Sequence, residues 1–358
     1  MHPFSETILS WYKKHARDLP WRRTKDPYAI WLSEIILQQT RISQGLPYFH
    51  DLLENFPTVH DLAQAEESVL FRHWQGLGYY SRARNLHKTA KYISNELHGI
   101  FPNTYEKLIK MPGIGPYTAA AISSFAFDEP KAVVDGNVFR ILSRYFGVET
   151  DISHSSARKI FTDLAEELIP TTQPAAFNQA IMEFGSLQCS PAPQCETCPL
   201  QTGCHAFEHK KVKEFPVKTQ KTKQRNRYFN YFIVEKDGQM LVRKRTEKDI
   251  WQGLFEFFLI ESDKKSTLEE LILSEPFLQV LPKKFLPLMN PAVHVLSHQK
   301  IYAQAWHVQL IDNFQLEIPP NYAWMLPKDL ENQGKPVLMI NLITDNMSLD
   351  VFQDFSVA

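Results

Sequence analysis

Apolar residues recur at helical spacing along the first part of the chain. They stand three or four positions apart, and proline, glycine or serine separates one such segment from the next. The pattern predicts a helical domain with helices over residues 5–16, 28–40, 67–77, 82–97, 104–110, 117–127, 138–146, 156–169 and 175–187.

The last part of the chain follows a different pattern. Two apolar runs over residues 227–245 flank Asp237 and Gly238, a dipeptide that favours a two-residue turn, so a β-hairpin is predicted there. Further strand-like runs cover residues 253–261, 300–311 and 335–343, and a helical run covers residues 266–274. We therefore predict an α+β domain after the helical domain.

Charge changes at the same place as the apolar pattern. Residues 1–227 hold 27 Lys+Arg and 23 Asp+Glu, whereas residues 228–358 hold 12 and 17. Residues 209–227 hold eight basic residues and one acidic residue, which is typical of an exposed linker and suits contact with phosphates. We predict a helical domain over residues 1–208, a basic linker over 209–227 and an α+β domain over 228–358.

Two kinds of segment are missing from the sequence. Residues 1–21 contain no apolar core that ends in a small-residue cleavage site, so they do not form a signal peptide. Apolar runs fall short of the roughly 18 residues that a membrane span needs. We expect a soluble, cytoplasmic protein with no membrane contact, whose thiols stay reduced.

All four cysteines fall within sixteen positions, as Cys189, Cys195, Cys198 and Cys204. Disulfides are not expected in a reducing compartment, so a metal site is favoured. Structural zinc sites usually combine two C-x2-C pairs, whereas this stretch has one such pair between two gaps of five residues. Four thiolates in one compact loop suit a [4Fe–4S] cluster, and the spacing favours one such cluster over zinc.

Residues 105–127 predict two helices joined by a tight turn. Gly113 and Gly115 permit backbone angles that other residues resist, and Pro116 stands where the second helix begins. The free N–H groups of such a turn form a site for an anion. An ordinary helix–helix corner shares this pattern, so the turn alone does not settle its role.

Two carboxyl groups have different predicted surroundings. Glu34 has large apolar residues at three of its four helical neighbour positions, so its pKa should be raised and it suits a general acid. Asp135 precedes a helical segment, whose free amides favour the ionised carboxylate. Cleavage of an N-glycosidic bond needs such an acid together with an anion near the sugar.

These motifs resemble a known group of enzymes. "MPGIGPYTAAAI", with Asp135 twenty residues after Gly115, is similar to the helix-hairpin-helix DNA glycosylase superfamily. "LPWR", "WLSEIILQQT", "GLGYYSRARNLHKTA", "VVDGNVFR" and "FNQAIMEFGSLQC" extend the resemblance to MutY-type adenine DNA glycosylases over the whole chain. The resemblance implies a six-helix barrel with an iron–sulfur loop, and a NUDIX-like (MutT-like) domain that binds rather than hydrolyses.

The resemblance also implies a role for individual residues. Glu34 would protonate adenine and activate water, Asp135 would stabilise the sugar cation, and Tyr117 and Asn137 would complete the polar wall. The adenine pocket would be lined by Trp21, Arg22, Leu37, Gln179 and Met182. DNA contacts would come from Gln39, Thr40, Leu77, Tyr79, Gly113, Gly115, Leu296, Ser297 and His298.

The implied activity is removal of adenine opposite 8-oxoguanine or guanine in duplex DNA, leaving an abasic site. The implied protein is a monomer that makes transient contacts with replication or repair proteins. Two positions depart from the family pattern: the first cysteine gap has five residues instead of six, and Leu296 replaces a phenylalanine.

Two other activities remain open from the sequence. An endonuclease III-like glycosylase/lyase would carry a lysine at position 117, and the tyrosine there favours a monofunctional enzyme. A non-catalytic DNA-binding module would not need both Glu34 and Asp135.

Overall fold

A computed structural model describes residues 1–219, 224–282, 284–310 and 315–346, and no side chains are described for 289–291. The chain forms two compact units. Unit 1 comprises residues 1–64 and 85–221, and unit 2 comprises residues 65–84 and 222–358. The predicted linker therefore contributes residues to both units, and its residues 220–223 lie outside the described part of the chain.

Helices make up unit 1, as the apolar periodicity predicts. The helices are α1 (Pro3–His15), α2 (Pro27–Leu37), α3 (Ile42–Asn55), α4 (Val59–Gln64), α7 (Tyr105–Leu108), α8 (Pro116–Phe127), α9 (Gly136–Phe146), α10 (Ala157–Leu168), α11 (Pro174–Leu187) and α12 (His205–Glu208), with short 3-10 turns η1 (Pro20–Arg22) and η2 (Cys195–Thr197). Helix α6 (Ser81–Glu96) begins in unit 2 and continues into unit 1, and α5 (Glu67–His73) belongs to unit 2.

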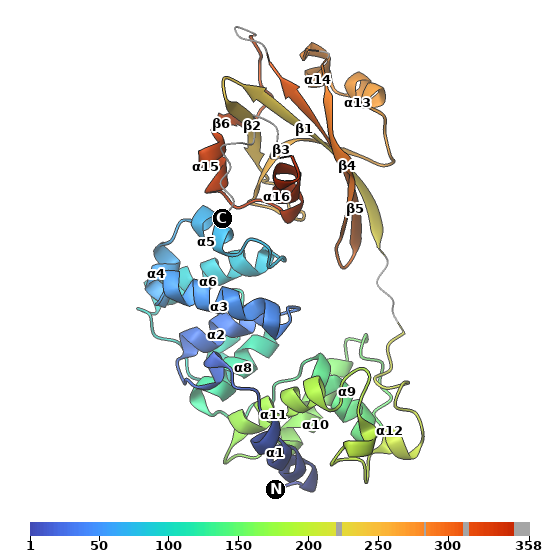
Figure 1. Cartoon of the computed structure of the whole chain (residues 1–358). Coiled ribbons are helices and arrows are strands. Elements are labelled where there is room, and N and C mark those ends of the chain that lie inside the picture. Colours follow the sequence, from blue (N-terminus) through green and yellow to red (C-terminus); the bar gives the residue numbers. More distant parts are fainter. Residues whose placement is uncertain (220–223, 283, 311–314, 347–358) are drawn as a thin grey trace. The chain divides into compact units, whose positions relative to one another are not determined.

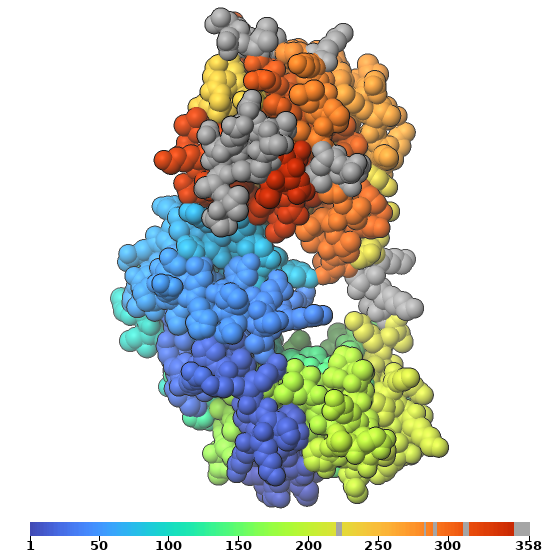
Figure 2. Space-filling view, in the orientation of Figure 1, coloured from blue at the N-terminus to red at the C-terminus, as the bar shows by residue number. Residues whose placement is uncertain are grey.

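The N-terminal helix closes the core of the second half of unit 1. Phe4 and Ile8 of α1 are fully buried against Phe161 and Phe177 of α10 and α11. Figure 2 shows the dark-blue N-terminal residues beside the green segment that contains α10 and α11. Residues far apart in the sequence therefore share one core, which carries α9 and α11 at fixed positions.

The predicted turn between two helices is present between α7 and α8. Gly113 adopts φ +77°, and a Cβ there would lie 2.8 Å from the Thr89 hydroxyl, so the position needs glycine. Gly115 caps the N-terminus of α8, and Pro116 occupies its first position. The first N–H groups of an α-helix have no partner within the helix, so the start of α8 has the free donors that an anion site requires.

Unit 2 is built on one sheet whose described strands run in the order β4-β5-β1-β3-β2-β6 (Figure 1). The strands are β1 (Arg225–Lys236), β2 (Gln239–Lys244), β3 (Phe255–Ser262), β4 (Leu286–Val295), β5 (Gln299–Gln309) and β6 (Tyr322–Met325). Strands β1 and β5 pair in parallel, and the other pairings are antiparallel.

Successive side chains of β1 point to opposite faces of the sheet and pack in two separate cores. Phe229, Tyr231 and Ile233 pack under α15 (Pro327–Glu331) and α16 (Val337–Thr344). Phe232 and Val234 pack on the other face with α13 (Leu268–Ser274) and α14 (Pro276–Val280). The sheet is therefore covered by helices on both faces (Figure 1).

The predicted hairpin around Asp237 and Gly238 joins β1 to β2, and both residues have positive φ, as a tight two-residue turn requires. The strand predicted over residues 335–343 is wrong, because this run forms helix α16. Its buried Leu338, Met339 and Leu342 recur at helical spacing. The strand predicted over residues 300–311 is β5, and its last predicted residue lies outside the described chain.

Residues 65–84 pack with the C-terminal residues in unit 2. Phe71 of α5 is fully buried, and it lies so close to Gly253 and Gly334 that a Cβ at either glycine would be 2.7 Å from its side chain. The Arg84 guanidinium donates a 2.6 Å hydrogen bond to the Gln252 carbonyl oxygen. This short segment is therefore an integral part of the core of unit 2.

Candidate active site

A cavity of about 650 Å³ in unit 1 brings together residues that are distant in the sequence. It is lined by Arg17, Leu19, Trp21, Arg22, Ile30, Ser33, Glu34, Leu37, Thr40, Arg41, Ile42, Ser43, Tyr117, Phe125, Asp135, Asn137, Gln179, Met182, Glu183 and Ser186. All four predicted catalytic residues and all five predicted adenine-pocket residues are among them. The volume is in the range of small-molecule sites.

Glu34 is a buried carboxyl group of this cavity. It lies on α2, whose N-terminus is capped by the Asp26 carboxylate, and only 7% of it is exposed. Burial raises its pKa from 4.5 to about 7, and a 2.8 Å hydrogen bond from the Tyr117 hydroxyl only partly opposes this. A carboxyl with a pKa near 7 can donate a proton at neutral pH and accept one afterwards.

Asp135 is the N-cap of α9. Its carboxylate accepts hydrogen bonds from the backbone N–H of Asn137 at 2.9 Å, the backbone N–H of Val138 at 2.8 Å and the Asn137 side-chain amide at 2.7 Å. These bonds favour the anion, as predicted, but burial outweighs them and the pKa of Asp135 is raised above its ordinary value. From the sequence we expected the helix N-terminus to lower the pKa of Asp135. This expectation is wrong, because burial of the carboxyl group raises its pKa.

Asn137 is itself held by a third residue that the sequence analysis did not single out. Arg140, one turn along α9, donates a 2.7 Å hydrogen bond to the Asn137 amide oxygen. The same guanidinium donates to the carbonyl oxygens of Gly185 and Cys189 at 2.6 and 2.8 Å. The amide of Asn137 is thereby oriented with its NH2 group toward Asp135.

Glu183 is a buried acid that the sequence analysis missed. Burial opposes its ionisation, but hydrogen bonds from Arg17 and Arg22 outweigh this effect and lower its pKa to about 2. It therefore fixes Arg22 at the cavity wall as an ion pair. One turn earlier on α11, the Gln179 amide oxygen accepts a 2.9 Å hydrogen bond from the Tyr12 hydroxyl. The spacing of Gln179, Met182 and Glu183 on one helix face is the signal that would have found this acid.

The four cysteines line one small cavity beside α9. None of the four forms a disulfide, and Arg144 donates to the Cys189 sulfur at 3.4 Å and to the Ser190 carbonyl oxygen at 2.7 Å. Over the described ranges of the chain, no three His, Cys, Asp or Glu side chains are arranged to hold a single metal ion. Four thiols around one cavity are the ligand set that a [4Fe–4S] cluster takes.

The predicted DNA contacts fall in both units. In unit 1, Gln39 is exposed with φ +57°, a backbone conformation that is uncommon outside glycine, and Thr40 lines the active-site cavity. In unit 2, Tyr79 is 41% exposed with φ +50°, whereas Leu77 is 4% exposed. Their contacts with DNA remain predictions.

A second cavity, of about 490 Å³, lies within unit 2 and contains the other predicted lesion contacts. It is lined by Gly76, Gly78, Tyr79, Tyr80, Ser81, Arg84, Asp249, Ile250, Trp251, His294, Val295, Leu296, Ser297, His298 and Val337. The hydroxyls of Tyr79 and Ser297 are hydrogen-bonded to each other. Tyr79 thus belongs to the same cavity wall as the loop 294–298, although more than two hundred residues separate them in the sequence.

Comparison with known proteins finds a match for the helical part of the chain and another for the sheet-containing part. Residues 32–167 match the HhH-GPD superfamily of base excision DNA repair proteins, and residues 230–345 match the NUDIX domain. A thermostable thymine-DNA glycosylase structure covers 57% of this chain and 95% of its own, with 30% identity and a TM-score of 0.53. A structure of endonuclease III in a non-covalent DNA complex, at 23% identity and a TM-score of 0.51, shares the fold.

Relatives of known activity extend over both units. The adenine DNA glycosylase of Buchnera aphidicola subsp. Baizongia pistaciae is 34% identical over 84% of this chain and 84% of its own length. The adenine DNA glycosylase of Homo sapiens is 30% identical over 94% of this chain and 72% of its own length. The chain therefore belongs to the adenine DNA glycosylase family. As a separate finding, helices long and apolar enough to cross a membrane do not occur among the described residues.

Proposed function

We propose that this protein removes adenine from A:8-oxoguanine and A:G pairs in duplex DNA by hydrolysis, leaving an abasic site. The observation that carries the proposal is the pairing of a raised-pKa carboxyl, Glu34, with a helix-capping carboxylate, Asp135, in one cavity. Membership of the adenine DNA glycosylase family supports adenine as the base that is removed.

The proposed reaction uses the two carboxyl groups in sequence. Glu34, protonated, donates its proton to N7 of the flipped adenine, so the base leaves as a neutral molecule with the electrons of the glycosidic bond. The sugar cation that forms is stabilised by, or transiently bonded to, the Asp135 carboxylate. Glu34, now ionised, takes a proton from a water molecule as that water attacks the sugar.

The surrounding residues would bind and orient the adenine. Trp21 and Met182 supply apolar walls, and Arg22 and Gln179 supply polar groups held by Glu183 and Tyr12. Binding an extruded base requires unstacking at a cost of a few kcal/mol. Gln39 and Tyr79 are the side chains that we propose to fill the vacated space.

We propose that the enzyme is monofunctional. Position 117 carries a tyrosine, and its phenol has no amine with which to form a Schiff base. Burial and Glu34 raise its pKa well above the ordinary value, so the hydroxyl stays protonated and donates to Glu34. Borohydride reduction during the reaction should capture little DNA on the protein. Strong covalent capture would favour the endonuclease III-like lyase instead.

A single [4Fe–4S] cluster is proposed for the loop that carries Cys189, Cys195, Cys198 and Cys204. When bound, the cluster crosslinks this loop through four thiolates. Arg144, which donates to the Cys189 sulfur, would offset part of the cluster's negative charge. The loop could then present a fixed surface to the DNA backbone.

Preference for 8-oxoguanine is proposed to reside in the cavity of unit 2. Good base contacts of this kind typically give about 1–3 kcal/mol of discrimination each. Because Phe71 packs on residues after 227, deletion of the C-terminal part would expose it, so point variants are the better test. Tyr79→Phe and Ser297→Ala should lower the ratio of single-turnover rates on A:8-oxoguanine and A:G while the A:G rate persists. An unchanged ratio in the double variant would assign the preference to unit 1.

A further inference from the structure

Two walls of the second cavity face each other and come from separate parts of unit 2, beside the wall that residues 76–84 form. One wall is the segment Asp249–Ile250–Trp251, which lies in the connection between β2 and β3. The other is the segment 294–298, which comprises the last two residues of β4 and the turn to β5. The rings of Trp251 and His294 face each other with centroids 5.7 Å apart. The spacing of these walls decides what the cavity admits.

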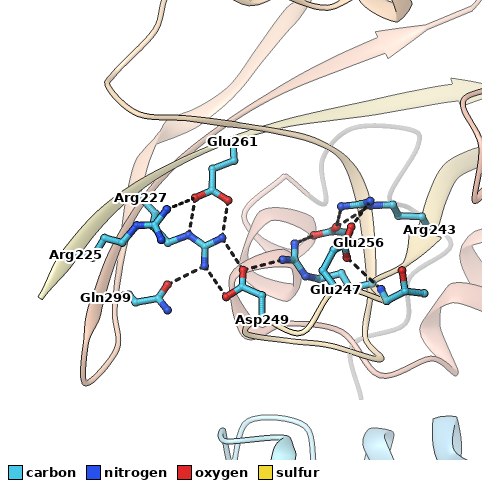
Figure 3. A network of polar contacts seen from close by, with 10 residues as sticks. Arg225, Arg227, Arg243, Glu247, Asp249, Glu256, Glu261 and Gln299 are labelled. Carbon is cyan, nitrogen blue, oxygen red and sulfur yellow. Dashed lines mark hydrogen bonds and ion pairs between the residues drawn. The ribbon is translucent and has the colours of Figure 1, made fainter.

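A single buried guanidinium connects both walls. Arg227 of β1 is 5% exposed, and Figure 3 shows its side chain between Glu261, Asp249 and Gln299. Its Nε and one terminal nitrogen donate to Glu261 at 2.6 and 2.5 Å. The two terminal nitrogens donate to Asp249 at 3.0 and 2.6 Å, and one also donates to Gln299 at 2.8 Å. All five donors of the guanidinium are thereby engaged.

Two of these acceptors, Asp249 and Gln299, each hold one wall in place. Asp249 begins the segment that carries Trp251, and Trp251 has φ +60°, so its conformation depends on the residues that hold the segment. Gln299 follows His298 directly. Its backbone carbonyl oxygen accepts a 2.8 Å hydrogen bond from the Leu296 backbone N–H across the turn. A displacement of Arg227 would therefore move both walls.

Ring contacts reinforce this connection. The Arg227 guanidinium lies 4.8 Å from the centre of the Phe229 ring, and that ring packs edge-on against Trp251 at 5.9 Å. A lysine at position 227 would keep the charge, but its single ammonium group cannot reach three acceptors in the fixed geometry of a guanidinium. The arrangement thus depends on arginine and not on positive charge alone.

We propose that Arg227 is a positioning residue for recognition of 8-oxoguanine, which sets the separation of the Trp251 wall and the 294–298 wall. The inference rests on the proposed role of this cavity in reading the base opposite adenine. 8-Oxoguanine differs from guanine only by an oxygen at C8 and a hydrogen at N7. Distinguishing them requires hydrogen-bonding groups held within about 0.5 Å.

Arg243 offers a matched control within the same unit. It is also partly buried and bonds to two carboxylates, Glu256 at 2.9 Å and Glu247 at 2.8 Å, and neither residue lines the cavity (Figure 3). Loss of either arginine removes hydrogen bonds to two carboxylates and should lower the melting temperature, although Arg245 still bonds to Glu256 and Asp249. Only loss of Arg227 should alter recognition.

The experiment uses the full-length protein and duplexes that contain A:8-oxoguanine or A:G. Single-turnover rates are compared for wild type, Arg227→Lys, Arg227→Met and Arg243→Met, together with melting temperatures. We expect both Arg227 variants to lower the rate ratio at least fivefold while the A:G rate stays within twofold of wild type. Arg243→Met should keep the wild-type ratio within twofold.

Gln299→Met provides a milder variant in case the Arg227 variants do not fold, because it removes only the link to the 294–298 loop. It should also lower the ratio. A wild-type ratio in Arg227→Lys or in Gln299→Met, or an equal loss in Arg243→Met, would overturn the positioning role. If wild type itself shows no preference for A:8-oxoguanine, the proposed lesion reading fails as well, so the two failures are distinguishable.

Discussion

The Tyr117 hydroxyl donates a 2.8 Å hydrogen bond to Oε2 of Glu34 inside the active-site cavity. This bond favours the ionised carboxylate, whereas burial favours the neutral acid, and burial is the larger effect. The tyrosine therefore moderates an acid whose pKa would otherwise be higher still. The balance between these two effects gives Glu34 a pKa of about 7.

Replacement of Tyr117 by phenylalanine should shift the pH dependence of excision. If the protonated form of Glu34 is the active one, the wild-type rate should fall as pH rises above about 7. Removing a hydrogen bond to the anion raises the pKa, so Tyr117→Phe should move this fall upward by on the order of one pH unit. Single-turnover rates between pH 5.5 and 9 measure the shift, and an unmoved or lowered midpoint would contradict it.

Glu34→Gln should be more stable than wild type at alkaline pH. The pKa of Glu34 is about 7 in the folded protein and 4.5 ordinarily, so the folded state binds this proton more tightly than the unfolded state. The wild-type free energy of unfolding therefore falls as pH rises from 4.5 to 7, by on the order of 3 kcal/mol, and glutamine removes this loss. Denaturant unfolding of both proteins at pH 5 and pH 8 tests the sign. A variant that gains no relative stability at pH 8 would show that Glu34 is not buried as an unfavourable anion.

Asp135→Asn should separate capping from catalysis. Asparagine is as good an N-cap as aspartate, so the variant should fold normally and bind DNA. A neutral amide cannot offset a sugar cation, so excision should fall by roughly 10²-fold or more. The matched variant Asp135→Ala should lose both the cap and the activity. Normal single-turnover rates in Asp135→Asn would reduce this residue to a helix cap.

The purified protein should be yellow-brown and contain about four iron atoms per chain. Cys198→Ser should lower the iron content, because it removes one of four thiolates around the cavity beside α9. Ser190→Ala is the control, since Arg144 bonds only to the backbone carbonyl of that residue. A colourless protein with one zinc ion per chain would contradict the cluster.

Local patterns in the sequence predicted much of this site, and long-range packing accounts for most of what they missed. Apolar spacing on one helix was enough to predict the raised pKa of Glu34. The capping bonds of Asp135 were also foreseen, but the burial that raises its pKa comes from segments far along the chain. Glu183 shares a helix face with Gln179 and Met182, which places it at the cavity, but its pairing with Arg22 spans 161 positions and no local pattern reveals that partner.

Two features of unit 2 show the same limit. Helix α16 was expected to be a strand, because Asn341 is the one polar residue in its run Val337–Ile343, and one polar position does not distinguish a period of 3.6 from a period of two. The grouping of residues 65–84 with the C-terminal residues depends on Phe71 packing against Gly253 and Gly334. A glycine in a sequence does not indicate which distant side chain packs against it.

The most direct test of the central claim is excision of adenine itself. Duplexes that differ only in the base opposite one adenine (8-oxoguanine, guanine or thymine) are incubated with excess protein and then treated with alkali, which cuts the strand at an abasic site. We predict cleavage at that adenine opposite 8-oxoguanine and guanine, none opposite thymine, and a rate lowered roughly 10²–10⁴-fold by Glu34→Gln. No cleavage by wild type, or cleavage by Glu34→Gln at the wild-type rate, would contradict the account of Glu34 as the acid of an adenine DNA glycosylase.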